Sequence, residues 1–562
     1  MAAPKATEDW TFLDTAMART RRGWSVLRDR GPGQIQFWFI ALAIGAASGF
    51  AALLFRRGIE SLQSLLYRVE DITRLASATR ELPWYLFILW PTLGGLIVGL
   101  ILFRLSPGGR VRSVAEVIEG AALRDGRVEI KAGLGSAAAS LITLGAGGSS
   151  GREGPVVHLA AVIATWVNDL IRARGVTARD LLGCAVAAAV SASFNAPIAG
   201  ALFALEVVLR HFAVHAFAPI VIASAIGTVI NRVEFGGVTE FELDQQSALE
   251  FYVELPAFLL LGLVCGAVAV ILMRAIFWTD DTAERLRARI GMPPWARPAV
   301  AGAVLGTIAI FFPHIIGVGY ETTALALTGE MLMREALVLA VVKVAAVAIT
   351  MGGRMGGGVF SPSLMVGSLV GLVFGTIATQ VFPDVSGANS LYALAGMGAV
   401  AAAVLGAPIS TTLIVFELTG DWQTGLAVMV AVSTSTALAS RLVDRSFFLT
   451  QLERRDVHLS KGPQAYLLCM FRVSNVMRPP DHLHAIPTDD VWEALEAGVY
   501  IEPNATLEKA MPMFEETARM WLPVVRMGET GEAPRIMGTL HHVDALSRYN
   551  RALAATAAEE HS

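Results

Sequence analysis

The sequence predicts an all-α integral membrane protein made of two inverted repeats with discontinuous, tilted helices, followed by a small α/β domain. Composition is the first reason. Apolar residues of the AVILMFWYC set make up 54 % of the 562 positions, and charged residues only 16 %, whereas soluble proteins usually carry about 25 %. So few charges do not cover the surface of a soluble protein of this size, and the expected solvent is a lipid bilayer. Interrupted apolar segments and an internal repeat are the second and third reasons.

Four apolar segments are about as long as the ~20 residues that cross a bilayer. They are residues 36–55, 82–103, 256–277 and 296–317. Shorter apolar pieces broken by Gly and Pro lie between and after them, at residues 133–149, 155–171, 181–209, 335–352, 362–382 and 390–418. Broken helices are tolerated in a membrane only where protein surrounds them or where they line a cavity. The pattern therefore favours a pathway over a simple anchor.

Basic residues flank the apolar region at both ends. Arg19, Arg21, Arg22, Arg28 and Arg30 precede the first span, and Arg441, Arg445, Arg454 and Arg455 follow the last. The positive-inside rule places such flanks in the cytoplasm. We therefore expect a multi-pass protein with both termini cytoplasmic, in the inner (cell) membrane of a bacterium.

Several classes of function are not favoured. A net charge of −4 predicts no nucleic-acid partner. Cys184, Cys265 and Cys469 lie far apart and form neither a disulfide framework nor a metal-ligand pair. His211 and His215 share a helix face but lack a third ligand, and no Ser/His pair stands inside the apolar region. We expect no enzyme, no metal and no cofactor.

An internal repeat divides the apolar region. Residues 142–155 (ITLGAGGSSGREGP) match residues 349–362 (ITMGGRMGGGVFSP), an offset of 207 residues (349 − 142). Residues 195–206 (NAPIAGALFALE) match residues 406–417 (GAPISTTLIVFE), an offset of 211 (408 − 197). Two related halves with paired Gly-rich breaks are typical of transporters, whose substrate site lies near the midplane between half-helices.

The repeated breaks have the form Gly-x-x-x-Pro. Pro fits the first turn of a helix, so we expect helices to begin at Pro155 and Pro362. Unpaired N–H groups and the positive end of the helix dipole then form an anion site. The alternative is that these glycines serve only close helix packing.

The first loop carries two charged residues, Arg152 and Glu153. A glutamate at membrane depth is costly and is a functional candidate. Ionised, Glu153 competes with an anion for the site; protonated, it can swing away, so that its titration couples anion passage to pH. The alternative is a structural salt bridge with Arg152, which is also a candidate anion contact.

Glu206 and Glu417 occupy matched positions of the repeat. Two interpretations stay open for the pair. One is buried structural hydrogen bonding, and the other is a path for protons through Glu206.

These motifs resemble the CLC family of chloride channels and proton/chloride exchangers. The matching segments are GREGP (151–155), GGVFSP (357–362), FNAPIAG (194–200) and LGAPIST (405–411), and the resemblance covers about residues 36–460. It implies an all-helical homodimer in a lipid bilayer, with one pathway for chloride or a related small anion in each subunit. It also implies that Glu153 is the gate, and that backbone N–H groups at Gly358, Val359 and Phe360 hold the central anion.

Two segments depart from the family pattern. The loop that in the family carries an anion-coordinating serine reads GRVRSVAEVIEG (109–120) here, and it aligns in two registers that place either Arg112 or Ser113 at the anion. The family's coordinating tyrosine is matched by Phe448, whose ring lacks the hydroxyl donor. Both changes bear on anion selectivity.

A third departure concerns protons. Family exchangers usually carry two consecutive acids where this chain has Glu206 and Val207. Val207 carries no proton, so the resemblance favours a passive chloride channel, with a proton/chloride antiporter as the alternative. A more remote alternative is a CBS-type sensor whose membrane part does not conduct.

The chain divides into three parts: a cytoplasmic segment (1–35), the membrane domain (36–460) and a tail (461–562). In the tail, residues 505–526 predict a helix and then a strand, and residues 535–549 another strand and helix. The tail resembles a CBS module with about one complete unit. Because an adenosine-nucleotide cleft generally needs two units, we favour a packing domain that stabilises a dimer over a nucleotide sensor.

Overall fold

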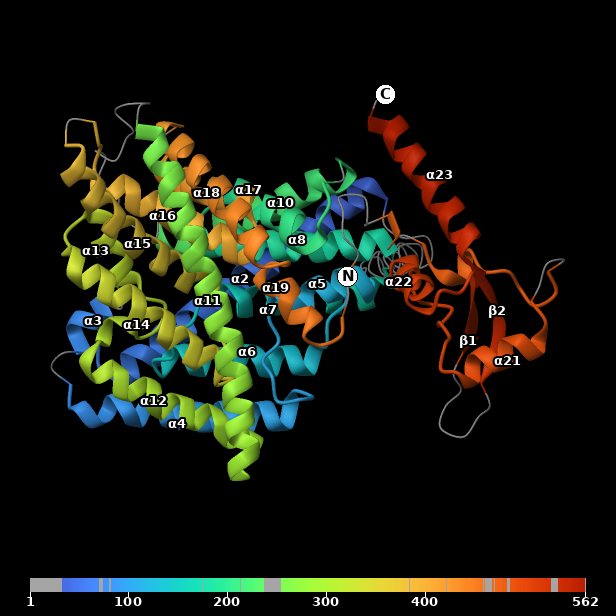
Figure 1. The fold of residues 1–562 in the computed structure, drawn as a ribbon, viewed down its shortest axis with the longest axis horizontal. Helices are drawn as coiled ribbons and strands as arrows, with labels where there is room; N and C mark the ends of the chain where they lie inside the picture. The colour runs from blue at the N-terminus through green and yellow to red at the C-terminus, as the bar shows by residue number, and fades with distance from the viewer. Residues whose placement is uncertain are drawn as a thin grey trace, which may run out of the picture.

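The computed structural model describes residues 33–560 apart from 70–73, 80–81, 174, 213, 237–253, 384, 421, 458, 460–466, 469–470, 483–485 and 527–533. The predicted N-terminal cytoplasmic segment lies almost entirely outside the described residues, as do its arginines and Cys469. The predicted fold class is confirmed: a large helical bundle stands beside a small tail that contains a two-stranded sheet (Figure 1).

The bundle follows the predicted order of long and interrupted helices. Its helices are α2 (Gln34–Tyr67), α3 (Leu75–Ala78), α4 (Trp84–Leu105), α5 (Val114–Leu123), α6 (Ile130–Gly145), α7 (Glu153–Ile171), α8 (Gly175–Phe194), α9 (Pro197–Phe203), α10 (Val214–Phe235), α11 (Leu255–Ile290), α12 (Arg297–Phe311), α13 (Tyr320–Thr328), α14 (Met333–Gly352), α15 (Phe360–Val381), α16 (Asn389–Leu405), α17 (Pro408–Thr419), α18 (Trp422–Leu442) and α19 (Phe447–Glu453). Within the described residues, ten helices are long and apolar enough to cross a membrane.

Two helices are longer than their apolar segments. α2 continues through Arg56 and Glu60, whose side chains pair at 2.8 Å, and α11 continues through Glu284 and Arg287, which pair at 2.6 Å. Such i,i+3 and i,i+4 pairs stabilise a helix where no apolar residue remains to bury. Both helices therefore extend past the apolar stretch that predicted them.

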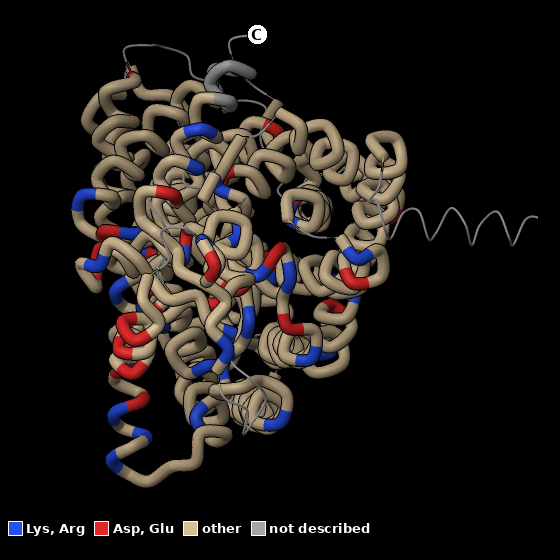
Figure 2. Tube along the Cα trace, turned by 90° about the vertical axis from the view of Figure 1, so that its right-hand side faces the viewer, with Lys and Arg blue, Asp and Glu red and all other residues tan. Residues whose placement is uncertain are grey.

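The repeat is visible in the packing. α4 and α12 lie side by side (Figure 1), and α9 contacts α17. α15 and α16 approach closely through glycines, because a Cβ on Gly367 would stand 2.3 Å from the carbonyl oxygen of Gly396. Small residues at such contacts are typical of helices packed in lipid. Seen from the side of the tail, most charged residues lie in the middle and lower part of the view, and the helices at the top carry few (Figure 2).

The tail contains α21 (Thr488–Glu496), α22 (Leu507–Thr517), β1 (Trp521–Arg526), β2 (Arg535–His541) and α23 (His542–Glu560). The helix–strand and strand–helix predictions are thus confirmed. β1 and β2 pair antiparallel, and Leu507, Phe514, Leu522 and Leu540 form part of a separate core. The assignment of this unit to the CBS type stays a prediction.

The tail is expected to lose stability in acid. Hydrogen bonds of 2.6 and 3.1 Å from Arg478 hold the pKa of the Asp544 carboxyl below its usual value, and burial lowers the pKa of His541. The unfolded tail therefore binds protons before the folded tail does, so that stability falls as the pH drops below about 6.5 for His541 and about 3.9 for Asp544.

Hydrogen exchange of β1 and β2 in the full-length protein checks this expectation. We expect the protection factors, which are corrected for the intrinsic exchange rate at each pH, to fall a few-fold between pH 7 and pH 3, since the groups are partly exposed. Asp544→Asn should remove the part of the pH dependence that lies below about pH 4. Protection factors that do not change with pH in the unaltered protein would contradict the expected loss of stability in acid.

Candidate anion-binding site

The two repeated breaks meet in the centre of the bundle. Gly151 and Gly358, which occupy matched positions of the repeat, form an antiparallel bridge with two reciprocal N–H···O bonds of 2.7 Å. α7 begins at Glu153 and α15 at Phe360, two residues before the expected starts at Pro155 and Pro362. The reason is that both prolines sit in a first helical turn, where no N–H is needed.

Glu153 crosses from one break to the other. Its buried carboxylate accepts hydrogen bonds from the Ser361 hydroxyl and, at 3.4 Å, from the Ser361 backbone N–H. Ser361 belongs to the first turn of α15, where N–H groups have no partner within the helix. A carboxylate therefore occupies the N-terminal end of α15, a place suited to an anion.

Arg152 is not the main partner of Glu153. The two side chains approach to 3.9 Å, whereas Arg152 donates a 3.0 Å hydrogen bond to the Ser193 carbonyl and lies over the Tyr320 ring at 5.4 Å. The ion pair between the two residues is thus longer than the hydrogen bonds that each makes to other residues, and the salt-bridge alternative stays open.

A small central cavity lies beside Glu153. It is lined by Val114, Glu153, Gly154, Val157, Val190, Phe203, Gly358, Val359, Phe360 and Phe448. Its volume, measured as the space open to the centre of a water molecule, is about 10 Å³, which is roughly one water. The structure thus brings together Glu153, Phe448 and the predicted backbone segment from Gly358 to Phe360.

The structure separates the two residues of the undecided loop. The Ser113 hydroxyl lies next to Gly154, since a Cβ on Gly154 would stand 2.5 Å from it. The Arg112 guanidinium lies 3.4 Å from Glu129 and 3.8 Å from Glu116. The Ser113 hydroxyl therefore lies beside Gly154, which lines the central cavity, and Arg112 is held by carboxylates. Which of the two contacts the anion stays a prediction.

Chain neighbours of the residues around the central cavity line two larger cavities. The first, called the outer cavity, is lined by Arg56, Glu60, Tyr320 and Arg152, the residue before Glu153. The second, the tail-side cavity near α19, is lined by Ser113 and Gly357, the neighbours of Val114 and Gly358. Glu153 itself lines the central cavity.

Glu206 and Glu417 each cap a helix of the other half. Glu206 accepts backbone N–H bonds from Ile409 and Ser410 at 2.9 and 2.8 Å. Glu417 accepts them from Ile198 and Ala199 at 2.9 and 2.8 Å. These are the first turns of α17 and α9, so the structural interpretation of the pair is supported by geometry. Proton passage through Glu206 stays a prediction.

Comparison with known proteins identifies the family. The family model "Voltage gated chloride channel" matches residues 94–440. A putative chloride channel protein, ClcB-like, of Ralstonia nicotianae is 32 % identical over 429 residues, which cover 75 % of this chain and 98 % of that protein. The chain belongs to the CLC family.

Other CLC proteins cover similar parts of the chain. The voltage-gated ClC-type chloride channel ClcB of an Escherichia coli strain is 29 % identical over 72 % of this chain and 95 % of its own. A slow cyanobacterial Cl⁻/H⁺ antiporter shares the fold, with a TM-score of 0.66, 19 % identity and coverage of 75 % of this chain and 98 % of its own. A eukaryotic CLC transporter, with a TM-score of 0.64 and 18 % identity, covers 90 % of this chain and 97 % of its own.

Sequence reasoning missed two contacts of this CLC site. One is Ser361 as the partner of Glu153; its position beside Pro362, in a first helical turn, was the available signal. The other is the crossed pairing of Glu206 and Glu417. Their matched positions suggested a common role, but the partner helices become apparent only when the two halves are placed face to face.

The crossed caps yield a stability prediction. Glu206→Ala and Glu417→Ala each leave two N–H groups without an acceptor, a cost of about 1–3 kcal/mol per group where no water replaces it. We expect both to lower the unfolding temperature of the purified protein, by similar amounts, and the Gln variants to lower it less. A large shift for one glutamate and none for the other would contradict the symmetric role.

Proposed function

We propose that this protein carries chloride, or a related small anion, across a lipid bilayer through the three cavities, with Glu153 as the gate. The observation that supports this most is the Glu153 carboxylate at the start of α15, where it lines the smallest of the three described cavities. Protonation would neutralise the carboxylate and release its place to an anion. Family membership agrees with transport rather than catalysis.

Anion contacts would come from both halves of the repeat. The N–H groups at Val359 and Phe360 lie at the start of α15, the Phe448 ring lines the same cavity, and the Ser113 hydroxyl lies beside Gly154. Peptide dipoles attract an anion without binding it as tightly as a full charge would, which conduction requires. Arg152 would act from the outer cavity, as a long-range attraction.

We favour a passive channel, because Val207 stands where a second acid would carry protons. The proton/chloride antiporter is the second candidate, since a slow cyanobacterial Cl⁻/H⁺ antiporter shares the fold. We further propose a homodimer in a bacterial inner membrane with both termini in the cytoplasm. Exposed apolar side chains at the matched positions Ile198 and Ile409 would suit a dimer contact.

The tail would serve packing rather than nucleotide sensing. An ion pair between Arg472 and Asp125 joins it to the segment that follows α5, the helix that begins beside Ser113. Binding of adenosine nucleotides by the purified protein would contradict this role.

Liposomes that contain the purified protein test the proposal. We expect chloride to leave them down its gradient once the membrane potential is collapsed. A chloride gradient that also drives protons uphill assigns the exchanger, and chloride flux without proton movement assigns the channel. Liposomes with no chloride flux at any pH between 4 and 8 would overturn the transport proposal.

A further inference from the structure

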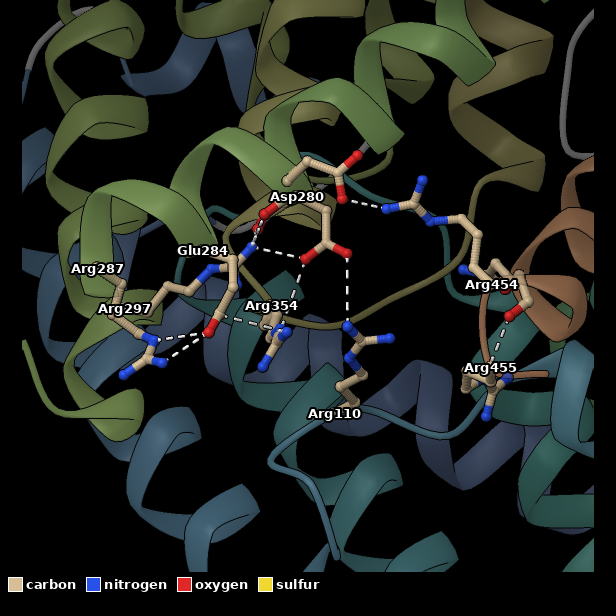
Figure 3. Close-up of polar contacts among 11 residues, drawn as sticks. Arg110, Asp280, Glu284, Arg287, Arg297, Arg354, Arg454 and Arg455 are labelled. Atoms are coloured by element: carbon tan, nitrogen blue, oxygen red, sulfur yellow. Dashed lines mark hydrogen bonds and ion pairs between the residues drawn. The ribbon is translucent and has the colours of Figure 1, made fainter. Parts of the chain in front are cut away.

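The cavity on the tail side is lined by an unusual number of arginines. Arg110, Arg354, Arg454 and Arg455 share its wall with the carboxylates of Glu116 and Asp280. Its volume is about 110 Å³, far more than one chloride needs. Figure 3 shows the side chains of α11 pointing toward this group of guanidinium groups.

The nearby carboxylates are already taken by other arginines. Arg297 is buried and donates to Asp280 at 2.7 Å and to Glu284 at 2.9 Å. Arg287 donates to Glu284 at 2.6 Å.

The same holds at the α19 end of the cavity. Arg454 pairs with Asp281, and Arg455 donates to Glu116 at 2.7 Å. Each carboxylate of the group therefore has at least one arginine at hydrogen-bond distance (Figure 3).

Arg110 and Arg354 have only the longer contacts in this group. Arg110 comes no nearer than 3.7 Å to Asp280, and Arg354 lies 3.5 Å from Asp280 and from Glu284. The ion pairs of the group join six arginines to four carboxylates, which leaves an excess of two positive charges (6 − 4) at this cavity. A bound anion would neutralise that excess and shorten the contacts of Arg110 and Arg354.

The end of α14 positions Arg354. Its φ of 59° is the left-handed conformation that commonly ends a helix, and Arg68 and Arg172 have it at the ends of α2 and α7. Arg354 lies between α14 and the Gly-rich break that leads to Val359.

We propose that Arg110 and Arg354 bind a phosphate-class oxyanion in the tail-side cavity. A guanidinium offers paired donors that match two oxygens of a tetrahedral oxyanion, and a polyvalent anion would satisfy both arginines at once. The source is either free inorganic phosphate or the headgroup of an anionic lipid.

The location gives the site a consequence that rests on the proposed function. The cavity opens onto Ser113, Gly356 and Gly357, next to the central cavity. A bound oxyanion would stand at the mouth of the chloride pathway and would lower chloride flux from the tail side.

Binding is tested first, independently of transport. We expect inorganic phosphate, added at constant ionic strength, to raise the unfolding temperature of the detergent-purified protein. In the Arg110→Gln/Arg354→Gln double variant the apparent affinity falls by at least about tenfold, because charge-assisted contacts are lost. Arg354→Lys keeps the positive charge but loses the paired donors of the guanidinium, so we expect an intermediate loss of phosphate affinity.

Arg289→Gln is the matched control, since it removes one positive charge from the exposed end of α11 outside the cavity. Nanodiscs with and without phosphatidic acid form the lipid arm. Stabilisation by phosphatidic acid that requires Arg110 and Arg354 assigns a lipid headgroup; stabilisation by inorganic phosphate assigns the free ion. If neither probe stabilises the unaltered protein, or if the double variant responds as Arg289→Gln does, the oxyanion site is refuted whatever the chloride flux.

Discussion

Glu153→Gln is expected to abolish the pH dependence of chloride flux. If ionised Glu153 blocks the start of α15, flux through the unaltered protein rises up to about tenfold per pH unit on acidification, over the range in which the carboxyl titrates. A glutamine is always neutral and cannot compete as an anion for the N–H groups near Ser361. The variant should therefore conduct at neutral pH as the unaltered protein does in acid. If the protein is an exchanger, the variant also loses proton coupling.

Glu60→Gln is the control for this experiment. Glu60 lines the outer cavity together with Arg152. Its neutralisation changes the charge of the proposed pathway but removes no carboxylate from the central cavity. We expect it to keep the pH dependence. If the chloride flux of Glu153→Gln depends on pH as that of the unaltered protein does, Glu153 is not the gate.

Gly154→Ala is expected to reduce chloride flux by narrowing the central cavity. A Cβ on Gly154 would stand 2.5 Å from the Ser113 hydroxyl oxygen and 3.2 Å from the Cα of Gly358. Overpacking of this kind costs about 1–3 kcal/mol, and on the transport barrier that is about tenfold or more in rate. We expect chloride flux to fall accordingly, and the unfolding temperature to fall by a few degrees, because the overpacked folded protein is destabilised.

A second substitution distinguishes narrowing from misfolding. Ser113→Ala removes the hydroxyl oxygen, which is the atom nearest to the added methyl group. The Gly154→Ala/Ser113→Ala double variant should therefore conduct chloride faster than Gly154→Ala alone. The flux of the double variant is compared with that of Ser113→Ala, so that the effect of the serine itself is removed. Gly33→Ala places a methyl group where the nearest atom is 3.9 Å away and should change nothing. A double variant no faster than Gly154→Ala would contradict the narrowing.

Much of the fold was predictable because the bilayer constrains a chain strongly. Apolar length located α4, α11 and α12, and Gly–Pro breaks located the starts of α7 and α15 to within two residues. α10 and α18 were not predicted individually. The charged ends of α2 and α11 were missed because they are stabilised by side-chain pairs, which an apolar pattern does not register.

The site was predictable where it depends on backbone and less so where it depends on side chains. Matched glycines predicted that two helix starts belong together, and Gly151 and Gly358 do form a bridge. The partners of Arg112 and Ser113 needed coordinates, because the glutamates that hold Arg112 come from different turns and loops; which of the two contacts the anion stays a prediction. Phe448 lines the central cavity as the family resemblance implied, and its effect on anion selectivity stays a prediction.

The crossed caps also affect how the chain is made. Ile198 and Ala199 need an acceptor that lies 219 and 218 residues later. At about 5–20 residues per second, a ribosome needs on the order of 10–40 seconds to supply it. Throughout that interval α9 has an uncapped start, so the first half of the nascent chain waits in an incomplete form. A translation pause or truncation between the halves would therefore expose an early intermediate to membrane quality control.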